Sequence, residues 1–163
     1  MLLKSIFSLL FALCVSAGFG QVDSNAVFLA SKGSWEYPLQ DKYEIQGLLD
    51  GFILNNATFY SNKPKAIHAL MPGHLVANIE IDGMHVVIVK FGDYFLTYSN
   101  LQKNSLKKGD YIEKGQLISF SEKGFLEGKY YVDIFLCYGK EDIDLNIPGW
   151  FKKDCKIEPF TTF

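Results

Sequence analysis

Turn dipeptides recur at short intervals through the chain and constrain its fold more than any other feature of the sequence. They are Asp82-Gly83, Gly92-Asp93, Gly109-Asp110 and Gly115-Gln116, and runs of strand length lie between or beside them. Turns about every 8 to 12 residues leave room for short strands but not for the amphipathic helices that connect parallel strands. The pattern therefore predicts an all-β domain with few or no helices.

A β-hairpin is predicted in the middle of the chain, where residues 75–81 and 84–90 flank Asp82-Gly83. This dipeptide tolerates the positive φ values that tight hairpin turns require. Two further strands are predicted at residues 94–99 and 129–138, because both runs are rich in aromatic and β-branched residues.

The last of these predicted strands alternates clearly between two kinds of side chain. Val132, Ile134 and Leu136 are predicted to point to one face, and Tyr131 and Asp133 to the other, because successive side chains of a strand alternate. The apolar face is expected to pack in the core.

The N-terminus predicts a cleaved secretory signal. Lys4 precedes an apolar run at residues 6–15, which small residues follow. The run is shorter than the roughly 20 residues needed to span a bilayer. We expect cleavage before Gln21, a secreted or periplasmic protein, and no transmembrane segment after cleavage. An uncleaved anchor and lipidation at Cys14 are the alternatives.

The rest of the chain is expected to contain one globular domain. Residues 1–20 form the signal, residues 21–50 an N-terminal entry segment, and residues 51–163 the main domain. Residues 26–31 are expected to form one or two helical turns.

Charge and cysteine content narrow the possible partners. All 16 basic residues are Lys, and 18 acidic residues give a net charge of -2. Without the guanidinium group of Arg, which binds phosphate in bidentate fashion, this composition argues against a nucleic-acid binder. Cys137 and Cys155 remain after signal cleavage. They form either a disulfide or two separate thiols, and the spacing does not decide between these.

A series of short motifs follows in a fixed order along the chain. They include Lys32-Gly33-Ser34-Trp35, Gly73-His74-Leu75-Val76, Thr97-Tyr98-Ser99-Asn100-Leu101, Gly115-Gln116-Leu117-Ile118 and Pro148-Gly149-Trp150-Phe151. In this order and spacing, residues 32–151 resemble the LytM or lysostaphin-type zinc endopeptidase domain, especially its version in EnvC-like murein hydrolase activators. The resemblance implies a LytM-like barrel-sandwich, known as the duplicated hybrid motif.

Members of this family that cleave peptidoglycan hold zinc with a His, an Asp four residues later, and the second His of a late His-x-His pair. The resemblance places these ligands at Asn55, Phe59 and Asp133, and two assisting His at Asn100 and Tyr131. Phenylalanine cannot ligate zinc, and an amide is a poor substitute for imidazole, so only Asp133 remains of the ligands. We therefore expect a degenerate site with no metal, no cofactor and no catalytic residue.

The family's catalytic groove is expected to survive as a binding groove. Its polar and aromatic side chains are predicted to be Asn55, Phe59, Tyr98, Asn100, Tyr131 and Asp133. Aromatic rings at such a site either stack on sugars and peptides or fill the space of the lost metal and water. Both interpretations stay open.

The resemblance implies a catalytically inactive domain that binds a cell-wall component or regulates a peptidoglycan hydrolase. Its expected partner is peptidoglycan or a cell-wall hydrolase. One alternative is a divergent zinc metalloendopeptidase acting on peptidoglycan through a relocated site, for which His68, His74 and Asp133 are the candidates. Another is an envelope-maintenance module that makes no contact with the wall.

Overall fold

The computed structural model describes residues 23–36, 38–39, 42–49, 52–124, 128–139, 141–142 and 150–151 of the chain. The predicted secretory signal, Cys14 and Cys155 lie outside these residues. Cys137 is half-buried, and its pairing with Cys155 stays an open prediction. No helix within the described residues is long and apolar enough to cross a membrane.

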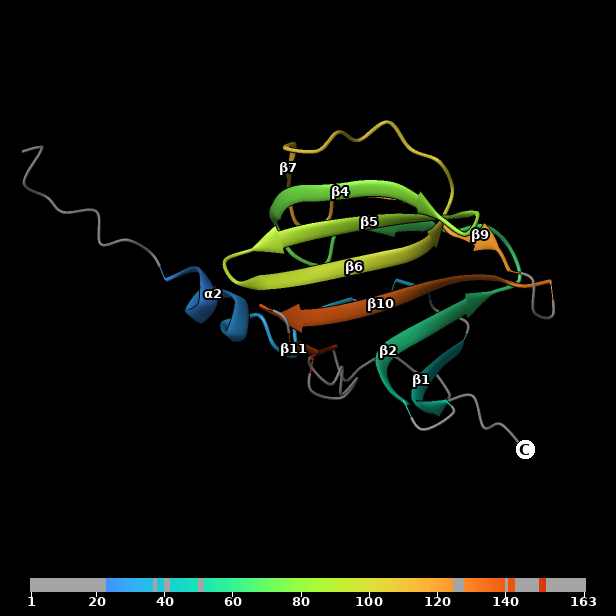
Figure 1. The fold of residues 1–163 in the computed structure, drawn as a ribbon, viewed down its shortest axis with the longest axis horizontal. Helices are drawn as coiled ribbons and strands as arrows, with labels where there is room; N and C mark the ends of the chain where they lie inside the picture. Colours follow the sequence, from blue (N-terminus) through green and yellow to red (C-terminus); the bar gives the residue numbers. More distant parts are fainter. Residues whose placement is uncertain are drawn as a thin grey trace, which may run out of the picture.

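The described part is almost entirely β-structure, with one short helix, α2 (Ser24–Ala30). Nine strands form a curled antiparallel sheet in the order β1-β2-β10-β6-β5-β4-β7, with β9 and β11 paired to β10 (Figure 1). Its strands are β1 (Lys42–Leu49), β2 (Phe52–Ser61), β4 (Gly73–Ile81), β5 (Met84–Phe91), β6 (Tyr94–Leu101), β7 (Tyr111–Ile112), β9 (Glu122–Lys123), β10 (Tyr130–Tyr138) and β11 (Glu141–Asp142). A second sheet pairs β3 (Ala66–His68) with β8 (Leu117–Phe120). The predicted all-β fold is confirmed.

The predicted turns lie where the sequence indicates. Asp82 and Gly83 have φ values of 51° and 80°, and they connect β4 to β5 in register from Ile81 and Met84 outward. Gly109 and Gly115 also have positive φ. Each of these turns uses the left-handed region of backbone space, which glycine enters without steric cost.

The core lies against one face of β10. Val132, Ile134 and Leu136 are all completely buried, as their alternation predicts, while Tyr131 and Asp133 on the other face are half-buried. Because the two faces of one strand differ in this way, the sheet separates an apolar interior from a second, more polar surface.

Both ends of the described chain contribute to the core. Trp35 forms a parallel β-bridge with Phe151, and its ring lies 4.9 Å from that of Trp150. Phe28 of α2 stacks on Tyr94 at a centroid distance of 3.9 Å. The N-terminal segment also supplies β1, which pairs with β2 as an edge strand of the sheet.

Candidate functional site

Three adjacent strands bring one carboxylate and two hydroxyl groups together. Asp133 of β10 is in register with Thr58 of β2 on one side and with Ser99 of β6 on the other. Thr58 Oγ1 donates to Asp133 Oδ1 over 2.5 Å, and Ser99 Oγ donates to Oδ2 over 3.3 Å. We call these three residues the Asp133 cluster. Each carboxylate oxygen accepts a hydrogen bond, so the cluster fixes the position of the carboxyl group.

The environment of Asp133 changes its acidity. Burial raises the pKa of the Asp133 carboxyl group, because the charged form loses contact with water, and the two hydroxyl hydrogen bonds partly offset this by stabilising the carboxylate. Thr58 and Ser99 are themselves buried. The cluster is therefore largely covered, and Asp133 holds its proton to a higher pH than a carboxyl group in water.

Two tyrosines border the cluster. Tyr60 of β2 and Tyr131 of β10 are in register, and their ring centroids lie 6.0 Å apart. The Tyr131 ring packs directly on the backbone of Gly124, where a Cβ atom would clash with it. Burial, and then the nearby Asp133, raise the pKa of Tyr131. We call Tyr60, Tyr131 and the Asp133 cluster the polar face.

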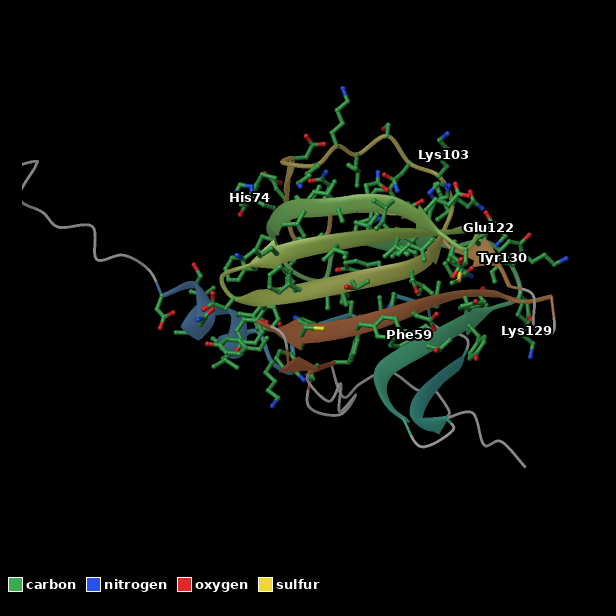
Figure 2. The ribbon with its side chains drawn as sticks, in the orientation of Figure 1. Phe59, His74, Lys103, Glu122, Lys129 and Tyr130 are labelled. Carbon is green, nitrogen blue, oxygen red and sulfur yellow. The ribbon has the colours of Figure 1, made fainter. Side chains whose placement is uncertain are left out.

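Phe59 lies on the other side of the sheet from the polar face. It is in register with Val132, is completely buried, and packs its ring 5.4 Å from that of Phe151 (Figure 2). The residue of β2 that faces Asp133 is Thr58. The placement of the Asp-ligand position at Phe59 is thus corrected by one residue, and the four-residue spacing then puts the first ligand position at Leu54. Asn55 belongs to β2, but its side chain lies outside the described part of the structure.

Tyr98 and Asn100 support the structure from within. Tyr98 is completely buried, and its hydroxyl oxygen accepts a hydrogen bond from Leu70 N–H over 2.9 Å. Burial raises the pKa of Tyr98 far above its usual range. Asn100 has a φ of 59°, and its Nδ2 donates to the carbonyl oxygens of Glu122 and Tyr131 over 2.9 and 3.0 Å. Asn100 therefore joins the end of β6 to β9 and β10.

The structure thus brings Tyr131 and Asp133 together on one face and places Phe59 and Tyr98 in the core. Thr58, Tyr60 and Ser99 belong to the site but were not among the predicted groove residues. The alternation of Ala57 and Phe59 with polar neighbours is the signal that identifies the polar side of β2.

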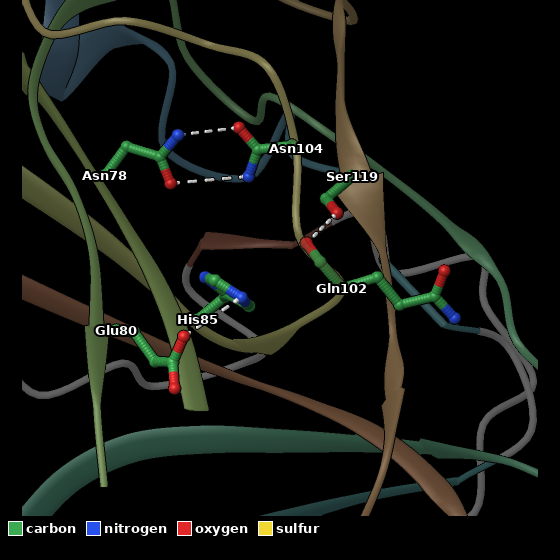
Figure 3. Close-up of polar contacts among 6 residues, drawn as sticks. All are labelled: Asn78, Glu80, His85, Gln102, Asn104 and Ser119. Atoms are coloured by element: carbon green, nitrogen blue, oxygen red, sulfur yellow. Dashed lines mark hydrogen bonds and ion pairs between the residues drawn. The ribbon is translucent and has the colours of Figure 1, made fainter. Parts of the chain in front are cut away.

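Two pockets lie elsewhere among the described residues. One, of about 510 Å³, lies between residues 34–38, residues 68–70 and the turn at residues 114–115. The other, of about 490 Å³, lies between residues 103–106 and β8. The loop beside the second pocket is held by paired Asn78 and Asn104 side chains and by Ser119 Oγ, which donates to Gln102 O (Figure 3). Residues of the polar face line neither pocket.

Comparisons with known proteins find solved structures of similar fold. No protein-family model matches the chain, and no curated protein matches its sequence. Csd3 from Helicobacter pylori matches with a TM-score of 0.56 and 18% identity over 68% of this chain, and the match spans 33% of Csd3. A chain of the SpoIIQ-SpoIIIAH pore forming complex has a TM-score of 0.58 and 15% identity, with 73% of this chain and 91% of that chain covered.

The catalytic domain of the antimicrobial peptidase lysostaphin from Staphylococcus simulans also matches. Its TM-score is 0.50 and its identity 18%, with 73% of this chain and 92% of that domain covered. The chain has the LytM-type peptidase fold. The identities are low, so the likeness concerns the fold.

Peptidases of the LytM type bind zinc, so the fit of the polar face to this metal can be tested. Zinc sites in proteins use thiolate, imidazole and carboxylate ligands. The Asp133 cluster offers one carboxylate and two hydroxyls, and no group of three or more His, Cys, Asp or Glu side chains suited to a metal occurs among the described residues. His74 lies at the opposite end of the sheet from Glu122 and Tyr130 (Figure 2). The described residues of the polar face do not fit a zinc site.

Proposed function

We propose that the protein is a secreted or periplasmic, catalytically inactive LytM-like domain that binds a cell-wall component or regulates a peptidoglycan hydrolase, in the manner of EnvC-like activators. One observation carries this proposal. Where the fold's peptidases need metal ligands around the late His-x-His position, Asp133 is hydrogen-bonded by the hydroxyls of Thr58 and Ser99. A zinc hydrolase needs three protein ligands and one open position for water.

The chemistry of the polar face suits binding. Tyr60 and Tyr131 are half-buried and close together, and aromatic rings of this kind stack on sugar rings and pack on peptide side chains. Asp133 beside them is a hydrogen-bonding group for hydroxyls or amides. We propose that the wall component, or a segment of a hydrolase, contacts these three side chains.

A role in protein binding draws support from the fold comparison. One matching chain belongs to the SpoIIQ-SpoIIIAH pore forming complex, so this fold occurs in an assembly of two proteins. The division into a signal at residues 1–20, an entry segment at residues 21–50 and a main domain at residues 51–163 is part of the same proposal.

The proposal is tested with protein that lacks residues 1–20, using purified sacculi and a purified peptidoglycan hydrolase. We expect sedimentation with sacculi or stimulation of the hydrolase, and no release of wall peptides by the protein alone. Tyr131→Ala should weaken binding by about 1 to 3 kcal/mol, because an aromatic contact at the centre of the site is lost. Tyr111→Ala is the matched control, since Tyr111 is an exposed tyrosine on β7, 55% accessible.

Metal content decides between this proposal and a divergent zinc metalloendopeptidase. We expect less than stoichiometric zinc after dialysis. One equivalent of zinc per chain together with chelator-sensitive cleavage of peptidoglycan would establish the enzyme instead. Equal binding by the parent, Tyr131→Ala and Tyr111→Ala would show that the polar face is not the binding site.

A further inference from the structure

The pocket of about 510 Å³ is built from three segments that are far apart in the sequence. Residues 34–38 form one wall, residues 68–70 the floor, and the turn at residues 114–115 the opposite wall. We call it the entry pocket. Its volume falls within the range of about 300 to 1,000 Å³ that is typical of small-molecule sites.

The floor and walls of the entry pocket are fixed by the core. Ala69 is held on both sides, since Gly115 N–H donates to Ala69 O over 2.8 Å and Ala69 N–H donates to Gln116 O over 2.9 Å. Leu70 N–H donates to the buried hydroxyl of Tyr98. The segment of the first wall is anchored by completely buried Trp35, whose backbone N–H donates to Trp150 O over 3.1 Å. The pocket is therefore formed before any ligand arrives.

The lining combines an apolar floor with charged groups of both signs. Ala69 and Leu70 are 3% and 5% exposed and close the bottom of the pocket. Lys114 lines one wall, and its Nζ lies 3.4 Å from Ser34 Oγ. Glu36 lines the facing wall. An ammonium group has three donors, so Lys114 retains capacity to bind a carboxylate while it contacts Ser34.

This arrangement specifies the charge pattern of a ligand. A carboxylate placed at Lys114 and Ser34 gains charge-assisted hydrogen bonds. An ammonium group at the other end of the same ligand meets the carboxylate of Glu36, and an apolar side chain covers Leu70. A doubly anionic or doubly cationic ligand would be repelled by one wall, because both signs of charge face the same small volume.

We infer that the entry pocket binds a short peptide with free amino and carboxyl ends, with its carboxylate at Lys114, its ammonium at Glu36 and its apolar side chain on Leu70. This site is separate from the polar face, and it goes beyond the proposed function.

The first experiment compares three forms of one dipeptide. Alanyl-leucine, its N-acetyl form and its C-terminal amide are titrated into the purified protein, and binding is measured by calorimetry or by NMR shifts. Saturable binding of the free dipeptide is expected, and each cap should weaken it at least about fivefold, since each removes one charge-assisted contact. No binding of the free dipeptide, or equal binding of all three forms, overturns the inference.

Variants then assign the contacts to side chains. Lys114→Met should weaken binding of the free dipeptide at least about fivefold. Lys103→Met is the matched control, because Lys103 is an exposed lysine that lines the other pocket, and it should have no effect. Glu36→Gln should weaken the free dipeptide but leave the N-acetyl form unchanged, since that form has already lost its ammonium group. Equal effects of the two Lys variants would overturn the assignment to this pocket.

One further variant separates this inference from the proposed function. Tyr131→Ala alters the polar face and should leave dipeptide binding unchanged, with circular dichroism as the check that the domain is folded. If Tyr131→Ala abolishes dipeptide binding, the dipeptide binds the polar face and the inference about the entry pocket is wrong. If dipeptide binding persists while sacculus binding fails, the entry pocket stands without the proposed function.

Discussion

Asp133 is a carboxyl group that folding moves out of water into contact with two hydroxyl groups. Its pKa in the folded protein is raised above the ordinary value of 3.8 because burial penalises the charged form. At a pH between these two values the folded state keeps the proton, whereas the unfolded state releases it. The contribution of Asp133 to stability is therefore fully present below pH 3.8 and is lost as the pH rises through the folded-state pKa.

Asp133→Asn should remove this dependence on pH. The amide is always neutral, and its oxygen can still accept a hydrogen bond from Thr58. We expect the free energy of unfolding of Asp133→Asn to rise relative to that of the parent as the pH increases from 3 to 7. The difference should change by no more than about 1.4 kcal/mol per pH unit, the limit for one titrating group.

Urea unfolding at a series of pH values measures this difference. Asp110→Asn is a control at an exposed aspartate. A difference between the parent and Asp133→Asn that stays constant with pH, or changes in the opposite direction, would contradict the burial argument.

Tyr98 stabilises the protein through its hydroxyl group. Tyr98→Phe would leave the buried Leu70 N–H without the acceptor it has at 2.9 Å. An unsatisfied buried donor costs about 1 to 3 kcal/mol, so we expect thermal or urea unfolding to show a loss of that size. Tyr111→Phe, at an exposed tyrosine, should change stability little. Equal stability of Tyr98→Phe and the parent would mean that water replaces the lost acceptor.

At the scale of the element, the strands and turns were predictable because their signals are local. Asp82-Gly83 and its flanking runs identify the β4–β5 hairpin, and the alternation from Val132 to Leu136 identifies the buried face of β10. These features depend on neighbouring residues alone, so the sequence is sufficient for them.

The pairing of distant strands was harder to predict. The register of β2 against β10 joins residues about 75 positions apart, and a shift of one residue exchanges the two faces of a strand. Thr58 and Phe59 exchange roles under such a shift. Tyr98 and Asn100 were placed in the groove because the residue types suit a binding site, but their burial depends on contacts with Leu70, Glu122 and Tyr131 that no local pattern reveals.

The start of β4 lies unusually close to β5. A Cβ atom at Gly73 would clash with the backbone carbonyl of Lys90 and would lie 2.8 Å from a methyl group of Val89. Backbone in a sheet cannot move aside easily, so Gly73→Ala should destabilise the protein by about 1 to 3 kcal/mol. Thermal unfolding measures the change.

Gly124→Ala provides an informative contrast to Gly73→Ala. The Cβ atom at Gly124 would meet the ring of Tyr131 rather than backbone, and a half-buried side chain can rotate. We expect a smaller loss of stability than for Gly73→Ala, together with a changed environment of Tyr131, visible in its NMR ring resonances. A greater loss of stability for Gly124→Ala would show that the Tyr131 ring is fixed in place.

At the scale of the whole molecule, the two ends of the described chain meet in one aromatic cluster. Trp35 contacts Phe28, Trp150 and Phe151, with ring centroids 5.8, 4.9 and 5.7 Å away. The same residue anchors the segment that forms one wall of the entry pocket. Stability of the core and shape of the pocket are therefore linked through one side chain.

Trp35→Ala should affect both properties. Loss of a buried Trp side chain costs about 3 to 5 kcal/mol, which is a large part of the stability of a small domain. Trp35→Phe retains an aromatic ring and should lose less. If that variant is folded at 10 °C by circular dichroism, its binding of alanyl-leucine should be weakened, because residues 34–36 are less firmly held. Val27→Ala, at an exposed position of α2, should leave stability and dipeptide binding unchanged. Full dipeptide affinity in a destabilised but folded Trp35→Phe would show that the wall is held by its other contacts and not by the aromatic cluster.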